Sequence, residues 1–160
     1  AAATAIRRAR RTLIVGSGLA AILVEFLGHS LQMIDLPARS VTGGEEPLAL
    51  ALAFLQPEDV VVGITFRRTP RNVVKAIQEA QTVGAQSIGI TDSELSPVNQ
   101  LADYPFVTHM GGVAHSSSPV AAVSLLNAFI AAISLGAPEQ TAQSLHQVDS
   151  AYRRSGLLGE

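Results

Sequence analysis

Short apolar runs alternate along this chain with longer stretches in which apolar residues recur every three or four positions. Strands buried on both faces read as continuous apolar runs, and the clearest are residues 12–15, 60–64 and 88–90. We expect two more strands at 36–41 and 105–109, and helices at 19–31, 47–55, 70–84, 97–103, 119–135 and 138–153. Such alternation is typical of βαβ units. It predicts an α/β fold, a three-layer α/β/α sandwich with one five-stranded parallel sheet.

Two stretches could be mistaken for export or membrane signals. The arginine-rich residues 7–11 precede the apolar stretch 13–27, as in a signal peptide. Glycines at positions 16 and 18 and the charge of Glu25 interrupt that stretch, so we interpret it as a strand followed by a helix. Residues 119–135 are almost wholly apolar but short for a bilayer span. We expect them to form a helix buried in the core or in a subunit interface.

The composition favours a single domain that associates with itself. The chain has 160 residues, of which 48% are hydrophobic and 15% charged. So much apolar surface predicts a subunit interface, and hence a homodimer or a higher homo-oligomer. A net charge of −2 gives no reason to expect direct binding of nucleic acid, and the absence of cysteine excludes disulfides and cysteine-ligated metals. We expect one domain over residues 1–160, with a core of about 5–136 and a C-terminal helix of about 138–154.

Polar loops follow three of the predicted strands, and they are the candidate functional segments. These loops are Gly16-Ser17-Gly18, residues 65–71 and residues 91–97. Because ligands of open α/β sheets bind beyond the carboxyl ends of the strands, the loops predict a pocket for a small anion-bearing ligand. Within the second loop, Arg67, Arg68 and Arg71 could fork onto phosphate or carboxylate oxygens. A solvated loop, or pairing of Arg71 across a dimer, remains the alternative.

Two further polar groups have a structural and a functional interpretation. Asp92 could do no more than cap its own turn. Ser116, Ser117 and Ser118 precede the helix at 119–135, and we expect them to cap it and to face the same pocket. Capping alone would also explain them.

The sequence does not favour a dinucleotide site, a catalytic histidine or a metal site. The glycine turn resembles a dinucleotide motif, but the acidic residue at the right spacing, Asp35, lies at a helix end rather than a strand end. His109 and His115 could be general bases, yet no carboxylate occurs between Asp103 and Glu139 to orient either of them. Histidines and carboxylates show no metal-ligand spacing. We therefore expect no catalytic residue, no metal and no cofactor.

Taken together, these segments resemble a SIS (sugar isomerase) domain, most closely that of RpiR-type bacterial transcriptional regulators. The resemblance extends over about residues 5–136. It rests on an ordered set of segments: residues 15–18 with Glu25, residues 59–68, residues 84–93, Ser96-Pro97 with residues 101–103, and Ser118 with residues 125–128. It implies a flavodoxin-like doubly wound sheet that binds phosphosugars at the strand carboxyl ends.

The resemblance also implies the site residues. They are Gly16, Ser17, Gly18, Thr65, Phe66, Arg67, Arg68, Thr69, Ser116, Ser117 and Ser118. The phosphate loop of the family reads Ser-x-Ser-Gly-x-Thr. Here Thr65 takes the first hydroxyl position, whereas Arg67, Arg68 and Pro70 replace the second Ser, the Gly and the Thr. Phosphate would therefore be held by guanidinium groups rather than hydroxyls.

The implied function is a cytoplasmic, phosphosugar-sensing effector-binding and dimerisation domain of a transcriptional regulator. Such regulators bind DNA through an N-terminal helix-turn-helix domain, which is not among these 160 residues. An isomerase or lyase is the first alternative. SIS isomerases carry a Glu near the start of the helix that would begin here at Ser116, and this chain has none there. A dimerisation module without a ligand is the second.

Overall fold

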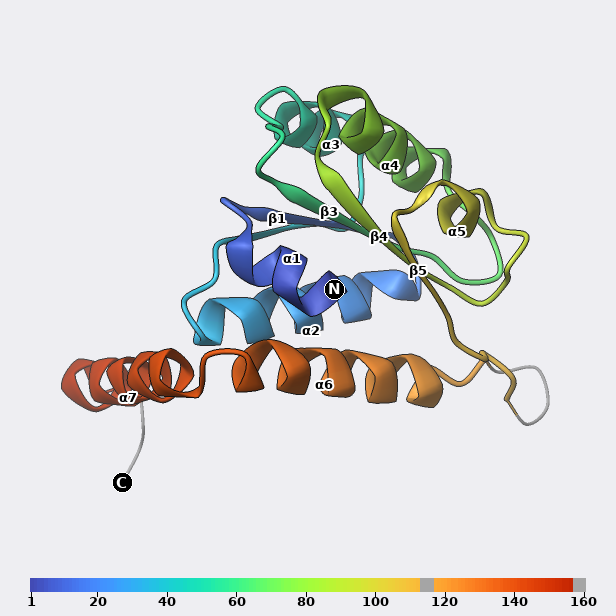
Figure 1. The fold of residues 1–160 in the computed structure, drawn as a ribbon. Helices are drawn as coiled ribbons and strands as arrows, with labels where there is room; N and C mark the ends of the chain where they lie inside the picture. Colours follow the sequence, from blue (N-terminus) through green and yellow to red (C-terminus); the bar gives the residue numbers. More distant parts are fainter. Residues whose placement is uncertain (113–116, 157–160) are drawn as a thin grey trace.

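Five parallel strands form one sheet in the order β2-β1-β3-β4-β5, with helices on both faces (Figure 1). This computed structural model describes residues 1–112 and 117–156. The order is that of flavodoxin-like doubly wound folds, in which the connections turn in opposite directions on either side of β1. The fold class expected from the sequence is confirmed.

The elements lie close to their predicted positions. The strands are β1 (Thr12–Val15), β2 (Ala38–Val41), β3 (Val60–Ile64), β4 (Gln86–Thr91) and β5 (Tyr104–Val107). The helices are α1 (Ala2–Arg8), α2 (Ala20–Met33), α3 (Glu45–Leu52), α4 (Arg71–Val83), α5 (Pro97–Leu101), α6 (Val120–Leu135) and α7 (Pro138–Ser155). Helix α1 was not predicted, because it is only seven residues long.

The register places the ends of β1 and β3 side by side. Thr12 aligns with Val60, and Val15 aligns with Gly63. One strand further along, Ile64 aligns with Ile90 of β4. The loops that leave β1, β3 and β4 therefore emerge at the same edge of the sheet, which is the edge where the sequence predicts a ligand.

Alternating residues of the central strands supply two cores, one on each face of the sheet. Leu13, Val15 and Val61 pack against α3, α4 and α5. Ile14 and Val62 face the other way and pack against α1, α2 and α6. Burial on both faces explains why β1 and β3 are continuous apolar runs in the sequence.

A buried ion pair fixes the opposite, amino-terminal edge of the sheet. The Asp59 carboxylate just before β3 is fully buried, and its Oδ2 accepts hydrogen bonds from Arg10 at 2.7 Å and Arg11 at 3.2 Å. The backbone N–H of Gln56 donates to the same oxygen at 3.1 Å. Part of the arginine cluster that resembles a signal peptide thus ties the entry of β1 to the entry of β3.

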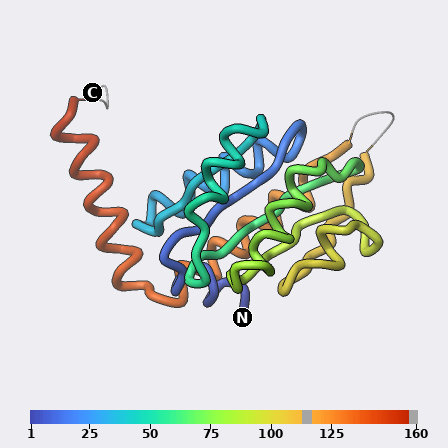
Figure 2. Tube along the Cα trace, turned by 90° about the horizontal axis from the view of Figure 1, so that it is seen from above, coloured from blue at the N-terminus to red at the C-terminus, as the bar shows by residue number. Residues whose placement is uncertain are grey.

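The last two helices differ sharply in burial. Helix α6 lies across α1 and α2, whereas α7 turns away from it by 106° and extends beyond the sandwich (Figures 1 and 2). Ser144 is the only residue of α7 that is buried. Within residues 1–112 and 117–156, no single helix is long and apolar enough to cross a bilayer; α6 and α7 reach the length only as a bent pair.

Candidate anion-binding site

A pocket of about 360 Å³ opens beyond the carboxyl ends of β1 and β3. It is lined by Ser17, Gly18, Leu19, Phe66, Arg67, Arg68 and Pro70. The lining thus comes from two loops that are distant in sequence and adjacent in the sheet. One of them leads directly into α2, whose dipole favours an anion at this end.

The loop after β1 is shaped by close backbone contacts. At Gly16, a Cβ atom would lie 2.8 Å from the carbonyl oxygen of Ile64 and 2.8 Å from a methyl carbon of Val24. Only glycine fits between these neighbours. Gly18 has a φ of 61°, in the left-handed region that favours glycine. Together they turn the chain tightly from β1 into α2 and leave the half-buried Ser17 at the pocket wall.

Two hydrogen bonds within the loop after β3 stabilise its conformation. The Thr65 side chain is buried, and its hydroxyl donates a 2.6 Å hydrogen bond to the carbonyl oxygen of Arg68. The N–H of Arg68 in turn donates to the carbonyl oxygen of Phe66 at 2.7 Å. The chain therefore folds tightly over Thr65. Both Arg67 and Arg68 are exposed and line the pocket above it.

Asp92 stabilises the unusual backbone of this loop. Arg67 has a φ of 62°, which costs a non-glycine residue about 1–2 kcal/mol. Its N–H donates a 2.9 Å hydrogen bond to Oδ2 of Asp92, in the loop after β4. Asp92 therefore has a structural partner outside its own turn, which the sequence did not indicate. This contact joins the loop after β3 to the loop after β4.

The Arg67 side chain also connects the pocket to the segment before α6. Its Nη1 donates a 3.1 Å hydrogen bond to the Ser117 hydroxyl. The expectation that the serines cap α6 is wrong for the two that the structure describes. Pro119 occupies the N-cap position without a side-chain cap, and Ser118 uses its backbone N–H to reach the carbonyl oxygen of Met110. Ser116 lies outside the described residues.

The pocket lining is positively charged. Within residues 1–112 and 117–156, the ion pairs are those that Arg10 and Arg11 make with Asp59, so Arg67 and Arg68 have no carboxylate within ion-pair distance there. Neither a carboxylate nor a histidine is among the described lining residues. Two guanidinium groups that form no ion pair among the described residues can bind an anion at an open pocket through charge-assisted hydrogen bonds.

The structure brings together part of the predicted ligand set. Ser17, Gly18, Phe66, Arg67 and Arg68 line the pocket, and Ser117 contacts Arg67. Four other predicted residues, Gly16, Thr65, Thr69 and Ser118, are not in the lining. Thr69 lies 3.4 Å from the Ser96 hydroxyl and stabilises the loop at its far end. Leu19 and Pro70 line the pocket but were not predicted, because apolar lining leaves no signal in a loop sequence.

The residues considered for other chemistries lie elsewhere. Asp35 follows α2 on an exposed turn at the amino-terminal edge of the sheet, away from the glycine turn that a dinucleotide would need. His109 is exposed and does not line the pocket. His115 lies outside the described residues.

Comparison with known proteins assigns this arrangement to a family. The sequence profile of the SIS domain matches residues 5–133. The chain is also similar to the sugar isomerase domain of an RpiR transcription factor from Sphaerobacter thermophilus, at 35% identity and a TM-score of 0.89. That match covers 93% of this chain and 83% of the other.

Two more distant matches share the fold or part of the sequence. The fold is that of Vibrio vulnificus NanR, solved in complex with ManNAc-6P, at 16% identity and a TM-score of 0.84 over 99% of this chain and 60% of that one. An uncharacterised HTH-type transcriptional regulator of Clostridium perfringens is 24% identical over 99 residues, which is 62% of this chain. The chain spans about a third of the length of the curated regulators it matches, 35% in each case. With the profile covering most of its length, the chain belongs to the SIS domain family, in the form found in RpiR transcription factors.

Proposed function

We propose that this domain binds a sugar phosphate as the effector of a transcriptional regulator and releases it unchanged. The phosphate would lie against Arg67 and Arg68, and the sugar would extend toward Ser17. DNA would be bound by another domain of the same regulator, in the cytoplasm, and two copies of this domain would associate.

The single observation that carries the proposal is the charge of the pocket. Arg67 and Arg68 line it, while the hydroxyl of Thr65, the one that a SIS phosphate loop would offer to the ligand, donates to Arg68 instead. Recognition therefore depends on guanidinium groups, which bind phosphate oxygens in pairs. Proton transfer between sugar carbons needs a positioned base, and neither a carboxylate nor a histidine is among the described lining residues.

The relatives support the regulatory part of the proposal. The similar domain from Sphaerobacter thermophilus belongs to a transcription factor, and the NanR protein, which shares the fold, was solved with ManNAc-6P. The Sphaerobacter structure shows that this fold serves in a transcription factor. The ligand of the present chain is inferred from its own pocket.

A binding screen followed by product analysis tests both halves. ManNAc-6P, other hexose and pentose phosphates and inorganic phosphate are added to the chain, and unphosphorylated ManNAc serves as the matched control. A ligand at about 100 times its Kd adds about 2.7 kcal/mol to the free energy of unfolding, which raises Tm by several degrees. We expect at least one sugar phosphate to do so and to be recovered unchanged.

Two results would contradict the proposal. Equal stabilisation by the phosphorylated and unphosphorylated forms of a sugar would show that the guanidinium groups do not select the ligand. Conversion of a bound sugar phosphate to an isomer would make the domain an isomerase.

A further inference from the structure

We infer that a second oxyanion site, for a phosphate or carboxylate group, lies between the end of α1 and the end of α6. A pocket of about 220 Å³ opens there, lined by Thr4, Arg7, Arg8, Ala132 and Gly136. It adjoins the amino-terminal edge of the sheet, because α1 leads into β1 and α6 runs back from the carboxyl-terminal edge. The site is therefore at the opposite end of the molecule from the pocket of Arg67 and Arg68.

Arg7 is the central residue of this second pocket. Its side chain is half-buried, and its Nη1 atom is buried without a hydrogen-bond partner among the described residues. The guanidinium lies directly against Gly136, where a Cβ atom would come within 2.5 Å of Nη1. The absence of a side chain at Gly136 thus leaves the space that the guanidinium occupies. Because Nη1 itself is shielded from solvent, an oxyanion in the pocket would accept hydrogen bonds from the other N–H groups of the Arg7 guanidinium.

The charge around Arg7 points to the same ligand chemistry. Arg8 places a second guanidinium on the pocket wall, and Thr4 adds a hydroxyl. No carboxylate is among the described lining residues, and the ion pairs within residues 1–112 and 117–156 are those of Asp59 with Arg10 and Arg11. Two guanidinium groups at one pocket raise the local positive potential, which favours an anion there. Arginine pairs suit carboxylate and phosphate oxygens because their N–H groups form a planar fork.

A purely structural role for Arg7 makes different predictions. The carbonyl groups at the end of α6 carry partial negative charge, which a nearby cation stabilises. Arg7 makes no hydrogen bond to these carbonyls among the described residues. Arg8 lies in the last turn of α1, where a cation is favourable even without a ligand, so its presence alone does not decide between the two roles. The two roles can be separated, since only an anion site makes Arg8 matter for phosphate binding.

The test is a titration of the isotope-labelled chain followed by NMR. Sodium phosphate and, in a parallel arm, sodium acetate are added at constant ionic strength, with sodium chloride as the reference salt. We expect saturable shifts of the amide signals of residues 4–8 and 132–136 with at least one of the two oxyanions. The arm that saturates at the lower concentration identifies the group as phosphate or carboxylate.

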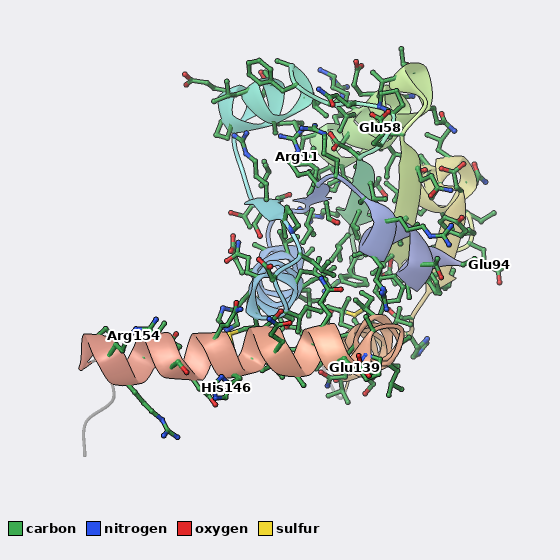
Figure 3. All side chains as sticks on the ribbon, turned by 60° about the vertical axis from the view of Figure 1, so that its left-hand side comes forward. Arg11, Glu58, Glu94, Glu139, His146 and Arg154 are labelled. Carbon is green, nitrogen blue, oxygen red and sulfur yellow. The ribbon has the colours of Figure 1, made fainter. Side chains whose placement is uncertain are left out.

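Four variants locate the binding. Arg7→Gln and Arg8→Gln should each weaken the response at residues 4–8 and 132–136 by roughly tenfold or more. Arg68→Gln, which removes a guanidinium from the other pocket, should leave it unchanged. Arg154→Gln is the matched control, because Arg154 is an exposed helical arginine on α7, outside the pocket (Figure 3).

Three outcomes would overturn the inference. The first is that the signals of residues 4–8 and 132–136 show no saturable response to either oxyanion. The second is an equal response in sodium chloride. The third is a response that persists in both Arg7→Gln and Arg8→Gln. Arg8→Gln keeps the test decisive if Arg7→Gln fails to fold, because Arg8 is exposed.

Discussion

Gly16 is the residue on which the shape of the anion pocket depends most directly. A Cβ there would contact a backbone oxygen of β3, which cannot move without disturbing the sheet. We expect Gly16→Ala to lower the free energy of unfolding by about 1–3 kcal/mol, as other overpacked positions do. The control is Gly43→Ala, where a Cβ would meet nothing within 4 Å. Urea unfolding compares the two variants, and equal stabilities would contradict the close contact.

Arg68 is the residue whose side chain is most directly available to bind the anion. It is exposed and lines the pocket, and its side chain makes no hydrogen bond within the described part of the chain. Arg68→Ala should weaken binding of the sugar phosphate found in the screen by roughly 10- to 150-fold, the loss of one charge-assisted hydrogen bond worth about 1.5–3 kcal/mol. Calorimetry measures this, with Arg154→Ala as the control. Unchanged affinity in Arg68→Ala and also in Ser17→Ala would show that the site is elsewhere.

Between elements, Asp92 links two loops that the sequence presents separately. It accepts the Arg67 N–H and so supports a left-handed backbone conformation in the neighbouring loop. Asp92→Ala should lower the free energy of unfolding by about 0.5–1.5 kcal/mol, because the solvent-exposed Arg67 N–H loses its hydrogen-bond partner. Ligand affinity should also fall several-fold, although Asp92 does not line the pocket. Asp149→Ala, on the exposed face of α7, is the control for both measurements. If Asp92→Ala binds the ligand as tightly as the parent, Asp92 does not contribute to ligand binding.

The sequence was sufficient for most elements of the fold. Strands β1 and β3 are buried on both faces and are almost wholly apolar, whereas β4 carries polar residues at both ends and is marked in the sequence by residues 88–90. Helix α1 was missed because it is only seven residues long. Its buried residues, Ala2, Ala5 and Ile6, do have helical spacing, and that weak signal precedes an arginine cluster that suggested something else.

The sequence predicted the location of the candidate site better than the side chains that line it. Parallel strands bring their carboxyl ends to one edge, so the meeting of the loops at Ser17 and Arg68 follows from topology. The inward turn of the Thr65 hydroxyl follows from the backbone of the loop, which depends on Arg67 adopting a positive φ. The reach of Arg67 to Ser117 likewise depends on tertiary geometry. Neither leaves a pattern in the sequence.

For the whole molecule, the exposed apolar surface of α6 has the greatest consequence. Val120 is 67% exposed and Leu135 is 76% exposed, at the two ends of one helix face. Small side chains, including Ser124, Ala128 and Ala131, occupy the exposed positions between them. A face of small and apolar residues allows close approach of another helix. It is the surface that we expect a second copy to cover.

Sedimentation tests that expectation. The parent chain should sediment as a dimer at micromolar concentrations, and Ala128→Glu should shift it to the monomer, because a buried carboxylate without a partner is unfavourable. The control is Leu50→Glu on α3, which is 55% exposed on the opposite side of the sheet. A monomeric parent would contradict the prediction, as would a dimer that Ala128→Glu leaves intact.

The near-complete exposure of α7 determines how its amide protons exchange with solvent. A helix of 18 residues with Ser144 as its one buried residue has little tertiary packing to keep it closed, and isolated helices of this length open readily. In dilute protein, its amides should therefore exchange deuterium far faster than those of α2 or α4. If copies associate through this side of the molecule, the exchange rate along α7 will fall as protein concentration rises, while the rate in the sheet stays constant. A rate that does not depend on concentration would show that α7 remains uncovered.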